Sequence, residues 1–95
     1  MSQAIAGDAR PLLAAKVRLR FDRHSGHHML LYPERGMVLN ESAARIAGLC
    51  NGDSSVSEIV DRLHADSPGA TREQIEADVQ AFLQALQERA LLRLA

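Results

Sequence analysis

Residues 29–40, MLLYPERGMVLN, begin as an apolar run, change to Pro33-Glu34-Arg35-Gly36, and resume for only three apolar residues before Asn40. A proline cannot donate to a strand ladder and so ends the first run, and a glycine is free to adopt the backbone angles of a sharp reversal. The stretch therefore predicts two antiparallel strands joined by a turn. We expect the second strand to cover only Met37–Leu39.

A further strand is expected upstream of this stretch. Val17, Leu19 and Phe21 alternate with charged residues in the period of two that characterises a half-buried strand. Ser25-Gly26 can supply a turn, after which residues 28–33 return as the next strand. In a simple meander of three strands the first and the third are edges, which carry unpaired backbone N–H and C=O groups.

Everything after Asn40 has the pattern of helices. Three apolar periodic segments each begin behind a capping signal, which is Asn40, then Ser55 with Glu58, then Thr71 with Gln74. The predicted ends are Asn51-Gly52, Ser67-Pro68-Gly69 and Arg89, so the last helix has about 18 residues. The first helix is expected to bury Ala43, Ile46, Ala47 and Cys50, and the third to bury Ile75, Val79, Phe82, Leu83 and Leu86.

Three short strands followed by three helices predict an α+β fold, in which an N-terminal three-stranded antiparallel sheet and the helices share one core. Winged-helix-like packing is the arrangement we expect. Residues 1–10 lack periodicity and are expected to form a flexible tail, and residues 11–95 to form the domain, beginning with an arm at residues 11–16.

Composition excludes several classes of function. The chain has 95 residues with 11 Lys and Arg against 12 Asp and Glu, so it lacks the basic surface that nucleic-acid binding requires. No apolar run approaches the length of a membrane span, and the N-terminal residues have no signal-peptide pattern. The single cysteine provides no disulfide framework, which fits a reducing cytoplasm. We therefore expect a cytoplasmic protein that binds neither nucleic acid nor membrane.

No residue pattern supports a catalytic or metal site. His24, His27 and His28 lie close together, but His27 and His28 would point to opposite faces of a hairpin and no acidic or thiol ligand lies at useful spacing. Cys50 belongs to an apolar stripe and is expected to be a buried, inert thiol. Asp53-Ser54 before a helix is similar to the attachment site of a phosphopantetheine carrier, yet the chain is not acidic and carriers lack an N-terminal sheet. We predict a protein that is not an enzyme and has no cofactor.

The third helix carries a second stripe beside its core face, composed of Gln74, Asp78, Ala81 and Ala85. Two of these four side chains are small, whereas a purely solvated face more often carries long polar chains. One interpretation is that the alanines lie under the N-terminal arm or a neighbouring helix. The other is that they leave a shallow groove beside an edge strand, into which an extended peptide could be laid by strand addition. The sequence pattern leaves both open.

An ordered set of segments resembles the PqqD family of pyrroloquinoline quinone (PQQ) biosynthesis. The segments are LLYPERGMVLN at residues 30–40, CNG at 50–52, VSEIV at 56–60 and DVQAFLQAL at 78–86. The resemblance runs from about Pro11 to Leu94. It implies a winged-helix-like domain without catalytic activity that binds the precursor peptide PqqA and presents it to the radical S-adenosylmethionine enzyme PqqE.

In modules of this kind the peptide adds as an antiparallel strand to the third strand and packs against the third helix. The resemblance therefore implies backbone pairing along the third strand and its approach, and a groove lined by the third helix. The implied peptide-binding residues are Arg35, Gly36, Met37, Val38, Leu39, Asp78, Ala81, Phe82 and Ala85.

The sequence departs from the family pattern at two places. Asn51 stands where the family often has Asp before Gly, a mild change because Asn also tolerates left-handed backbone angles. Ala90 stands where a Gly commonly ends the last helix. Without a glycine here the helix can run on through Leu91 and Leu92, so the sequence leaves the path of residues 90–95 open.

A DNA-binding regulator and a small metal-dependent enzyme are the two alternatives to the family function. A winged-helix DNA-binding regulator would need a basic recognition helix, but residues 72–89 carry two Arg against four Asp and Glu. A small metal-dependent enzyme would rest on the three clustered histidines alone. The oligomeric state stays open, because an exposed edge strand can pair with its own copy, and a homodimer is compatible with the sequence.

Overall fold

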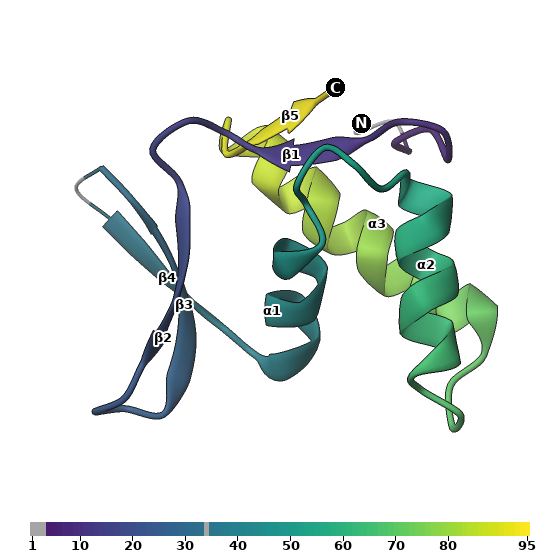
Figure 1. The fold of residues 1–95 in the computed structure, drawn as a ribbon, viewed down its shortest axis with the longest axis horizontal. Coiled ribbons are helices and arrows are strands. Elements are labelled where there is room, and N and C mark those ends of the chain that lie inside the picture. The colour runs from purple at the N-terminus through teal and green to yellow at the C-terminus, as the bar shows by residue number, and fades with distance from the viewer. Residues whose placement is uncertain (1–3, 34) are drawn as a thin grey trace.

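The computed structural model describes residues 4–33 and 35–95, which form two small sheets and three helices (Figure 1). The elements in chain order are β1 (Pro11–Leu13), β2 (Arg18–Asp22), β3 (His27–Tyr32), β4 (Arg35–Leu39), α1 (Glu41–Gly48), α2 (Val56–Ala65), α3 (Arg72–Glu88) and β5 (Leu92–Leu94). The predicted α+β fold, with an N-terminal antiparallel sheet followed by three helices, is confirmed.

The larger sheet has the strand order β2-β3-β4, and both of its pairings are antiparallel. Leu30 at its centre lies opposite Leu19 on one side and Met37 on the other. Among the described residues β2 and β4 each pair with one strand only, so both are edges of this sheet, as predicted. Helix α1 contacts all three strands and lies between the sheet and the other two helices (Figure 1).

The predicted length of the last strand in this sheet was wrong. Strand β4 begins at Arg35 and not at Met37, because Arg35 pairs with Tyr32 and Gly36 pairs with Leu31. Gly36 has an extended backbone, so it does not make the reversal. A Cβ atom built on Gly36 would lie 3.2 Å from Leu31 Cδ2, which shows that its small size is what the strand uses. The connection consists of Pro33 and Glu34, and Glu34 lies outside the described residues.

Phe21 was predicted to face the core but is 55% exposed. Alternation along β2 does place it on the inner side, next to Leu19, but here the sheet projects beyond α1 (Figure 1). Its ring packs edge-on against His28, with 5.0 Å between the ring centroids. The following turn uses the predicted Gly26, which has a φ of 74° and donates its N–H to Asp22 O at 2.8 Å.

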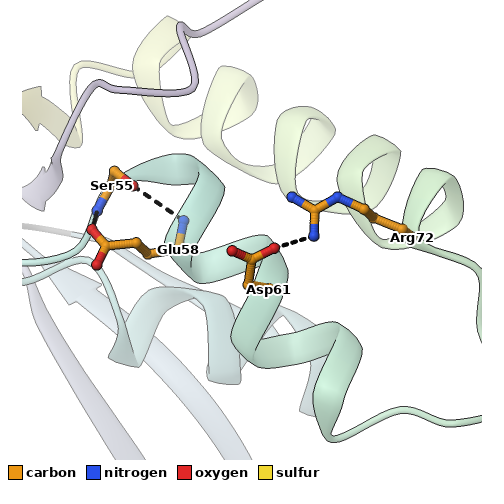
Figure 2. A network of polar contacts seen from close by, with 4 residues as sticks. All are labelled: Ser55, Glu58, Asp61 and Arg72. Atoms are coloured by element: carbon orange, nitrogen blue, oxygen red, sulfur yellow. Dashed lines mark hydrogen bonds and ion pairs between the residues drawn. The ribbon is translucent and has the colours of Figure 1, made fainter.

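The predicted capping residues begin all three helices. Asn40 Oδ1 accepts a hydrogen bond from the Ala43 N–H at 2.8 Å. Ser55 and Glu58 form a reciprocal capping box at α2, drawn in Figure 2, with hydrogen bonds of 2.9 and 3.1 Å. Thr71 and Gln74 form the equivalent box at α3. Each cap satisfies backbone donors that the first helical turn leaves unpaired.

Helix α2 packs on α3, and an ion pair crosses between them. Arg72 on α3 pairs with Asp61 on α2, and Figure 2 shows their side chains meeting between the two helices. Both side chains are largely exposed, so this pair contributes little to stability. The apolar residues between the helices, among them Ile59, Leu63 and Val79, hold them together.

The predicted end of the first helix was also wrong. Helix α1 stops at Gly48, before Asn51-Gly52, and Cys50 therefore lies beyond it. The reason is tertiary, because the chain here pairs with the N-terminal arm: Asn51 forms a bridge with Leu12, and the Leu13 N–H donates to Cys50 O at 3.1 Å.

The structure decides the path of residues 90–95, which the sequence left open: the last helix does not run on through Leu91 and Leu92. Helix α3 ends at Glu88, and Ala90 has a φ of 60°, in the left-handed region that the family's glycine would occupy without strain. The chain then reverses, and β5 pairs with β1, so that Pro11 lies opposite Leu94 and Leu13 opposite Leu92. Leu91 and Leu92 are buried by this reversal, which offsets the cost of the backbone conformation.

Parts of residues 4–10, within the stretch predicted to be a loose tail, are hydrogen-bonded to the helices. Ile5 is 5% exposed, and its N–H and C=O are both hydrogen-bonded to the side-chain amide of Gln80 on α3, at 2.9 and 2.8 Å. Farther on, the Val56 N–H donates to Ala9 O at 2.9 Å. Residues 1–3 of the predicted tail lie outside the described residues.

Among residues 4–33 and 35–95, no helix combines the length and the apolar character needed to cross a membrane.

Replacing Ala90 by glycine is expected to stabilise the protein by about 0.5–1 kcal/mol. The left-handed backbone costs an L-residue about 1 kcal/mol or more, of which glycine's greater freedom in the unfolded chain cancels a part. Urea denaturation followed by circular dichroism measures the difference. As a control, Ala77→Gly at an exposed position within α3 should destabilise by about 1 kcal/mol. Destabilisation by both substitutions would contradict the prediction.

Candidate functional site

The free edge of β4 is the first part of the candidate site. Side chains alternate along this strand, so that Leu39 is buried and Met37 is half-buried against the core, while Val38 on the other face is 60% exposed. Arg35 and Gly36 are also exposed. Beyond Arg35 the edge therefore presents a backbone with small or apolar side chains and few obstacles to an approaching chain.

A hollow begins where β4 ends. It lies between the N-terminal half of α1 and the middle of α3, and it is lined by Asn40, Ser42, Ala43, Ile46, Asp78, Ala81 and Phe82. Three of the predicted residues on α3, namely Asp78, Ala81 and Phe82, are therefore brought together on one wall. Ala81 is exposed and Phe82 is half-buried, so small and apolar surface faces the hollow.

The opposite wall of this hollow was missed by the sequence analysis. It is formed by the first turns of α1, where Ser42 and Ala43 are small and Ile46 closes the floor. The signal was present in the sequence, because Ala43 and Ile46 were both assigned to the buried stripe of this helix. Ala43 is only half-buried, and the neighbouring Ala44 takes the buried position.

A narrow recess of about 50 Å³ continues the hollow toward α2. It shares Ser42, Ile46 and Asp78 with the hollow and adds apolar side chains from α2 and α3, including Leu63 and Ile75. We call the hollow and this recess together the α1–α3 groove. It extends from the end of β4 toward α2.

The remaining predicted site residues have other surroundings. Ala85 is half-buried and does not line the groove. Gln74, from the same stripe, is used in the capping box of α3. The N-terminal arm pairs with β5 through Pro11–Leu13, and Ile5 lies against the side of α3 that carries Glu76 and Gln80. Asp78 and Ala81 of the stripe line the hollow opposite α1, and the binding of a peptide there stays a prediction.

Polar chemistry at the groove is confined to its rim. No polar or charged side chain of the described residues is buried, and Asp78 is exposed. Arg45 at the rim pairs with Asp66 at 3.3 Å, with both side chains about half exposed. Such a site can recognise a ligand by shape, apolar contact and backbone pairing, and it offers no preorganised group for acid–base or nucleophilic chemistry.

The clustered histidines lie at the β2–β3 turn, at the end of the sheet where β4 leads into α1, and His28 pairs with Leu39. None of the three lines the hollow. His24 is in the turn between β2 and β3, where its N–H donates to Asp22 Oδ1 at 3.1 Å, and His27 is exposed at the start of β3. Ser25 donates to the same carboxylate at 2.8 Å, and this hydrogen bond is the main reason why the pKa of Asp22 is lowered. The part of the chain that the structure describes has no group of three His, Cys, Asp or Glu residues placed to hold a metal.

Cys50 is buried, as predicted, although it lies just beyond the helix to which it was assigned. Its Sγ donates to Ile46 O at 3.3 Å, and burial raises its pKa to about 12. The thiol is therefore protonated at neutral pH, and only the thiolate is an effective nucleophile.

The fold and the site together define a class of winged-helix-like recognition domains. A similar solved structure is that of the PqqD truncation of Methylobacterium extorquens PqqCD, described as a functional, stand-alone recognition element for ribosomally synthesised and post-translationally modified peptides. It superimposes with a TM-score of 0.79 at 36% identity, covering 95% of both chains. Another is TbiB1 in complex with the TbiA(beta) leader peptide, with a TM-score of 0.72 at 25% identity, covering 86% of this chain and 94% of that one.

The chain belongs to the PqqD family. The model of that family, coenzyme PQQ synthesis protein D, matches residues 27–92. A PqqA binding protein of Xanthomonas oryzae pv. oryzae is 40% identical over 91 residues, which cover 96% of this chain and 98% of that protein. A PqqA binding protein of Azotobacter vinelandii is 37% identical over 94 residues, which cover 99% of both. These are names of a binding protein and not of an enzyme, in agreement with the expected lack of catalytic activity.

Native protein at pH 8 is expected to react with a thiol reagent such as dithionitrobenzoate at least a hundredfold more slowly than protein unfolded in urea. The thiolate fraction of Cys50 is small at a pKa of about 12, and its sulfur is not accessible. Absorbance measures the rate. Stepwise addition of urea should raise the rate in parallel with unfolding measured by circular dichroism. Rapid labelling of the folded protein would contradict the assignment of Cys50 as a structural residue.

Proposed function

We propose that the protein binds the precursor peptide PqqA by adding it as an antiparallel strand to β4, and that it presents the peptide to the radical S-adenosylmethionine enzyme PqqE in PQQ biosynthesis. Family membership and relatives named as PqqA binding proteins support the choice of peptide. The similarity to TbiB1, which was solved with a leader peptide, supports the mode of recognition. A single unpaired cysteine fits the reducing cytoplasm as the place of action.

The observation that carries the proposal is the free edge of β4 at the mouth of the α1–α3 groove. In an antiparallel pair every second residue directs its N–H and C=O away from the partner strand. Only two residues separate Tyr32 from Arg35, and the residues that close such a short hairpin are hydrogen-bonded to each other. The outward groups of β4 then belong to Gly36 and Val38, which would pair with the peptide backbone.

Side chains of the added strand would alternate between two environments. Those on the inner side would lie beside Met37 and Leu39 and reach the groove at Ala81, Phe82 and Asp78. Backbone pairing supplies affinity that is indifferent to sequence, and the groove supplies selectivity for side chains of suitable size. Arg35 at the start of the strand and Ala85 on α3 complete the proposed set of peptide-binding residues.

The DNA-binding alternative has less support. Helix α3 is the longest helix and would be the candidate for recognition, but it presents the exposed carboxylates Glu73, Glu76 and Asp78. These charges repel phosphate.

A homodimer remains a proposal that involves the same edge. A second copy paired through β4 would occupy the groups that the peptide needs. Peptide affinity measured at rising protein concentration would then fall, which separates this arrangement from a dimer formed elsewhere.

Replacing Val38 by proline is expected to weaken PqqA binding at least tenfold, which corresponds to about 1.4 kcal/mol. The substitution removes an outward N–H, and the ring obstructs the added strand. Isothermal titration calorimetry with the peptide measures the effect. Phe21→Pro is the matched control, since the same alternation directs the N–H of Phe21 outward on the opposite edge, β2.

Equal affinities of the wild type and the Val38→Pro variant would rule out strand addition at β4. Hydrogen exchange gives a reading that does not depend on a variant. Bound peptide should slow exchange at the amides of Gly36 and Val38, whereas the amide of Met37 is already bonded to β3 and should change less.

Replacing Ala81 by tryptophan is expected to fill the α1–α3 groove and weaken PqqA binding at least tenfold, with little change in stability because the position is exposed. Ala77→Trp is the matched control, because Ala77 is also exposed on α3 but does not line the groove. Fluorescence anisotropy of labelled peptide measures affinity, and urea denaturation checks folding. Similar losses in both variants would show that the groove is not the binding site.

A further inference from the structure

The outer face of the β2-β3-β4 sheet, turned away from the helices, has no cover among the described residues (Figure 1). Two cross-strand rows that span all three strands form the centre of this face, and a further pair, Asp22 and His27, continues it at the β2–β3 turn, where the Asp22 carboxylate accepts hydrogen bonds within the turn. One row is Arg20, Met29 and Val38, and the other is Arg18, Leu31 and Gly36. We call these six residues the outer sheet face.

The centre of this face is more apolar than a solvated face should be. An antiparallel sheet with one face in water normally alternates apolar and polar residues along each strand. The polarity of the side chains does not alternate along β3, because Met29 and Leu31 on the outer face are apolar, as is the buried Leu30 between them. Leu31 is 37% exposed, and Val38 adds a further apolar side chain from β4.

The apolar side chains of this face form one continuous patch. A Cβ atom built on Gly36 would lie 3.2 Å from Leu31 Cδ2 and 3.4 Å from Met29 Cε. Both side chains therefore lean over the glycine, next to Val38. Exposed apolar patches rimmed by polar groups are typical of protein interaction sites.

The rim of the patch is basic. Arg18 and Arg20 lie on the β2 side, and neither forms an ion pair with a carboxylate of the described residues. The charge asymmetry extends to the whole chain, since residues 11–40 carry five Lys and Arg against two Asp and Glu. Residues 41–95 carry five Arg against nine Asp and Glu. The sheet is therefore the basic part of an otherwise acidic protein.

We propose that the outer sheet face is a second docking surface, for a folded protein that presents an apolar patch with an acidic rim. The proposal rests on the proposed function, in which that partner is the enzyme that receives the peptide. The peptide would extend the sheet beyond the edge of β4, which leaves the part of the outer face on β2 and β3 accessible. One domain could then hold the peptide and the enzyme at the same time.

Charge complementarity favours this occupant over a second copy. Two copies meeting through the same face would bring the arginines of both close together, and like charges at an interface oppose association. An acidic partner gains attraction from the same arginines, and this attraction also accelerates the encounter at low salt.

The test is a double charge reversal, Arg18→Glu with Arg20→Glu, in the full chain. Calorimetry measures the binding of the PqqA-loaded protein to PqqE and, separately, the binding of PqqA alone. The variant should bind the enzyme at least tenfold more weakly and the peptide unchanged. The control is Arg62→Glu with Arg93→Glu, which changes the net charge equally at exposed positions on α2 and β5 and should bind both normally.

A second variant, Leu31→Ser, tests the apolar centre without altering charge and should weaken enzyme binding several-fold. Urea denaturation and unchanged peptide affinity show that each variant is folded. Raising the salt concentration should weaken enzyme binding of the wild type more than that of the charge-reversed variant.

Each other outcome has a definite meaning. Equal enzyme binding by all folded variants would overturn the docking surface and leave the proposed function intact. Peptide binding by the wild type without any enzyme binding would overturn both the presentation step and this surface. Loss of peptide affinity in the folded charge-reversed variant would place the face in the peptide site. A wild-type dimer in sedimentation that is lost in this variant, with enzyme binding unchanged, would identify a second copy as the occupant. Both of the last two results overturn the proposal.

Discussion

The complete burial of Leu30 is the constraint on which the arrangement of the sheet depends. This side chain lies at the centre of the middle strand, between Leu19 and Met37, and faces α1 with 0% exposure. Because side chains alternate across a strand, a slip of one residue would turn the buried row outward. The burial of Leu30 thus fixes the register of three strands at once. It determines which residues of β4 face the groove and which form the outer sheet face.

The pairing of β1 with β5 is a second constraint, and it acts on the helical part of the molecule. The arm β1 pairs with β5, and the chain between α1 and α2 joins the same strand through Leu12 and Asn51. Ile5 extends these contacts along α3 through its two hydrogen bonds with Gln80. The described parts of both terminal segments, residues 4–13 and 92–95, are therefore bound to the helical part and do not cover β4. These contacts hold the three helices together, and they leave both edges of the larger sheet unpaired.

The absence of buried charge among the described residues explains what kind of work the molecule is suited to. A catalytic site usually contains titratable groups whose pKa values are shifted by burial or by close partners. Here the lowered pKa values of Asp22 and Glu58 arise from local hydrogen bonds at exposed positions, and the raised pKa of Cys50 reflects a sulfur inside the core. What remains at the surface is an unpaired strand edge, a small-residue groove and an apolar face with a basic rim. These are features of recognition, and they lie on separate sides of one sheet.

Features that depend on near neighbours in the chain could be predicted from the amino-acid sequence alone. The helix starts at Asn40, Ser55 and Thr71 were predictable because a cap is a contact between residues three positions apart. The alternation along the strands was predictable because it reflects the pleat of a single strand. Family resemblance added the peptide-binding role of the edge strand and of the α3 residues. Four other features could not be predicted from local sequence. The pairing of β1 with β5, the early end of α1, the left-handed turn at Ala90 and the α1 wall of the groove each depend on segments far apart in the sequence. Local propensity favoured longer helices at the ends of α1 and α3. The backbone pairing at Asn51 outweighed it at the end of α1, and the burial of Leu91 and Leu92 outweighed it at the end of α3. Long-range burial and hydrogen bonding can exceed the small helix preferences of single residues.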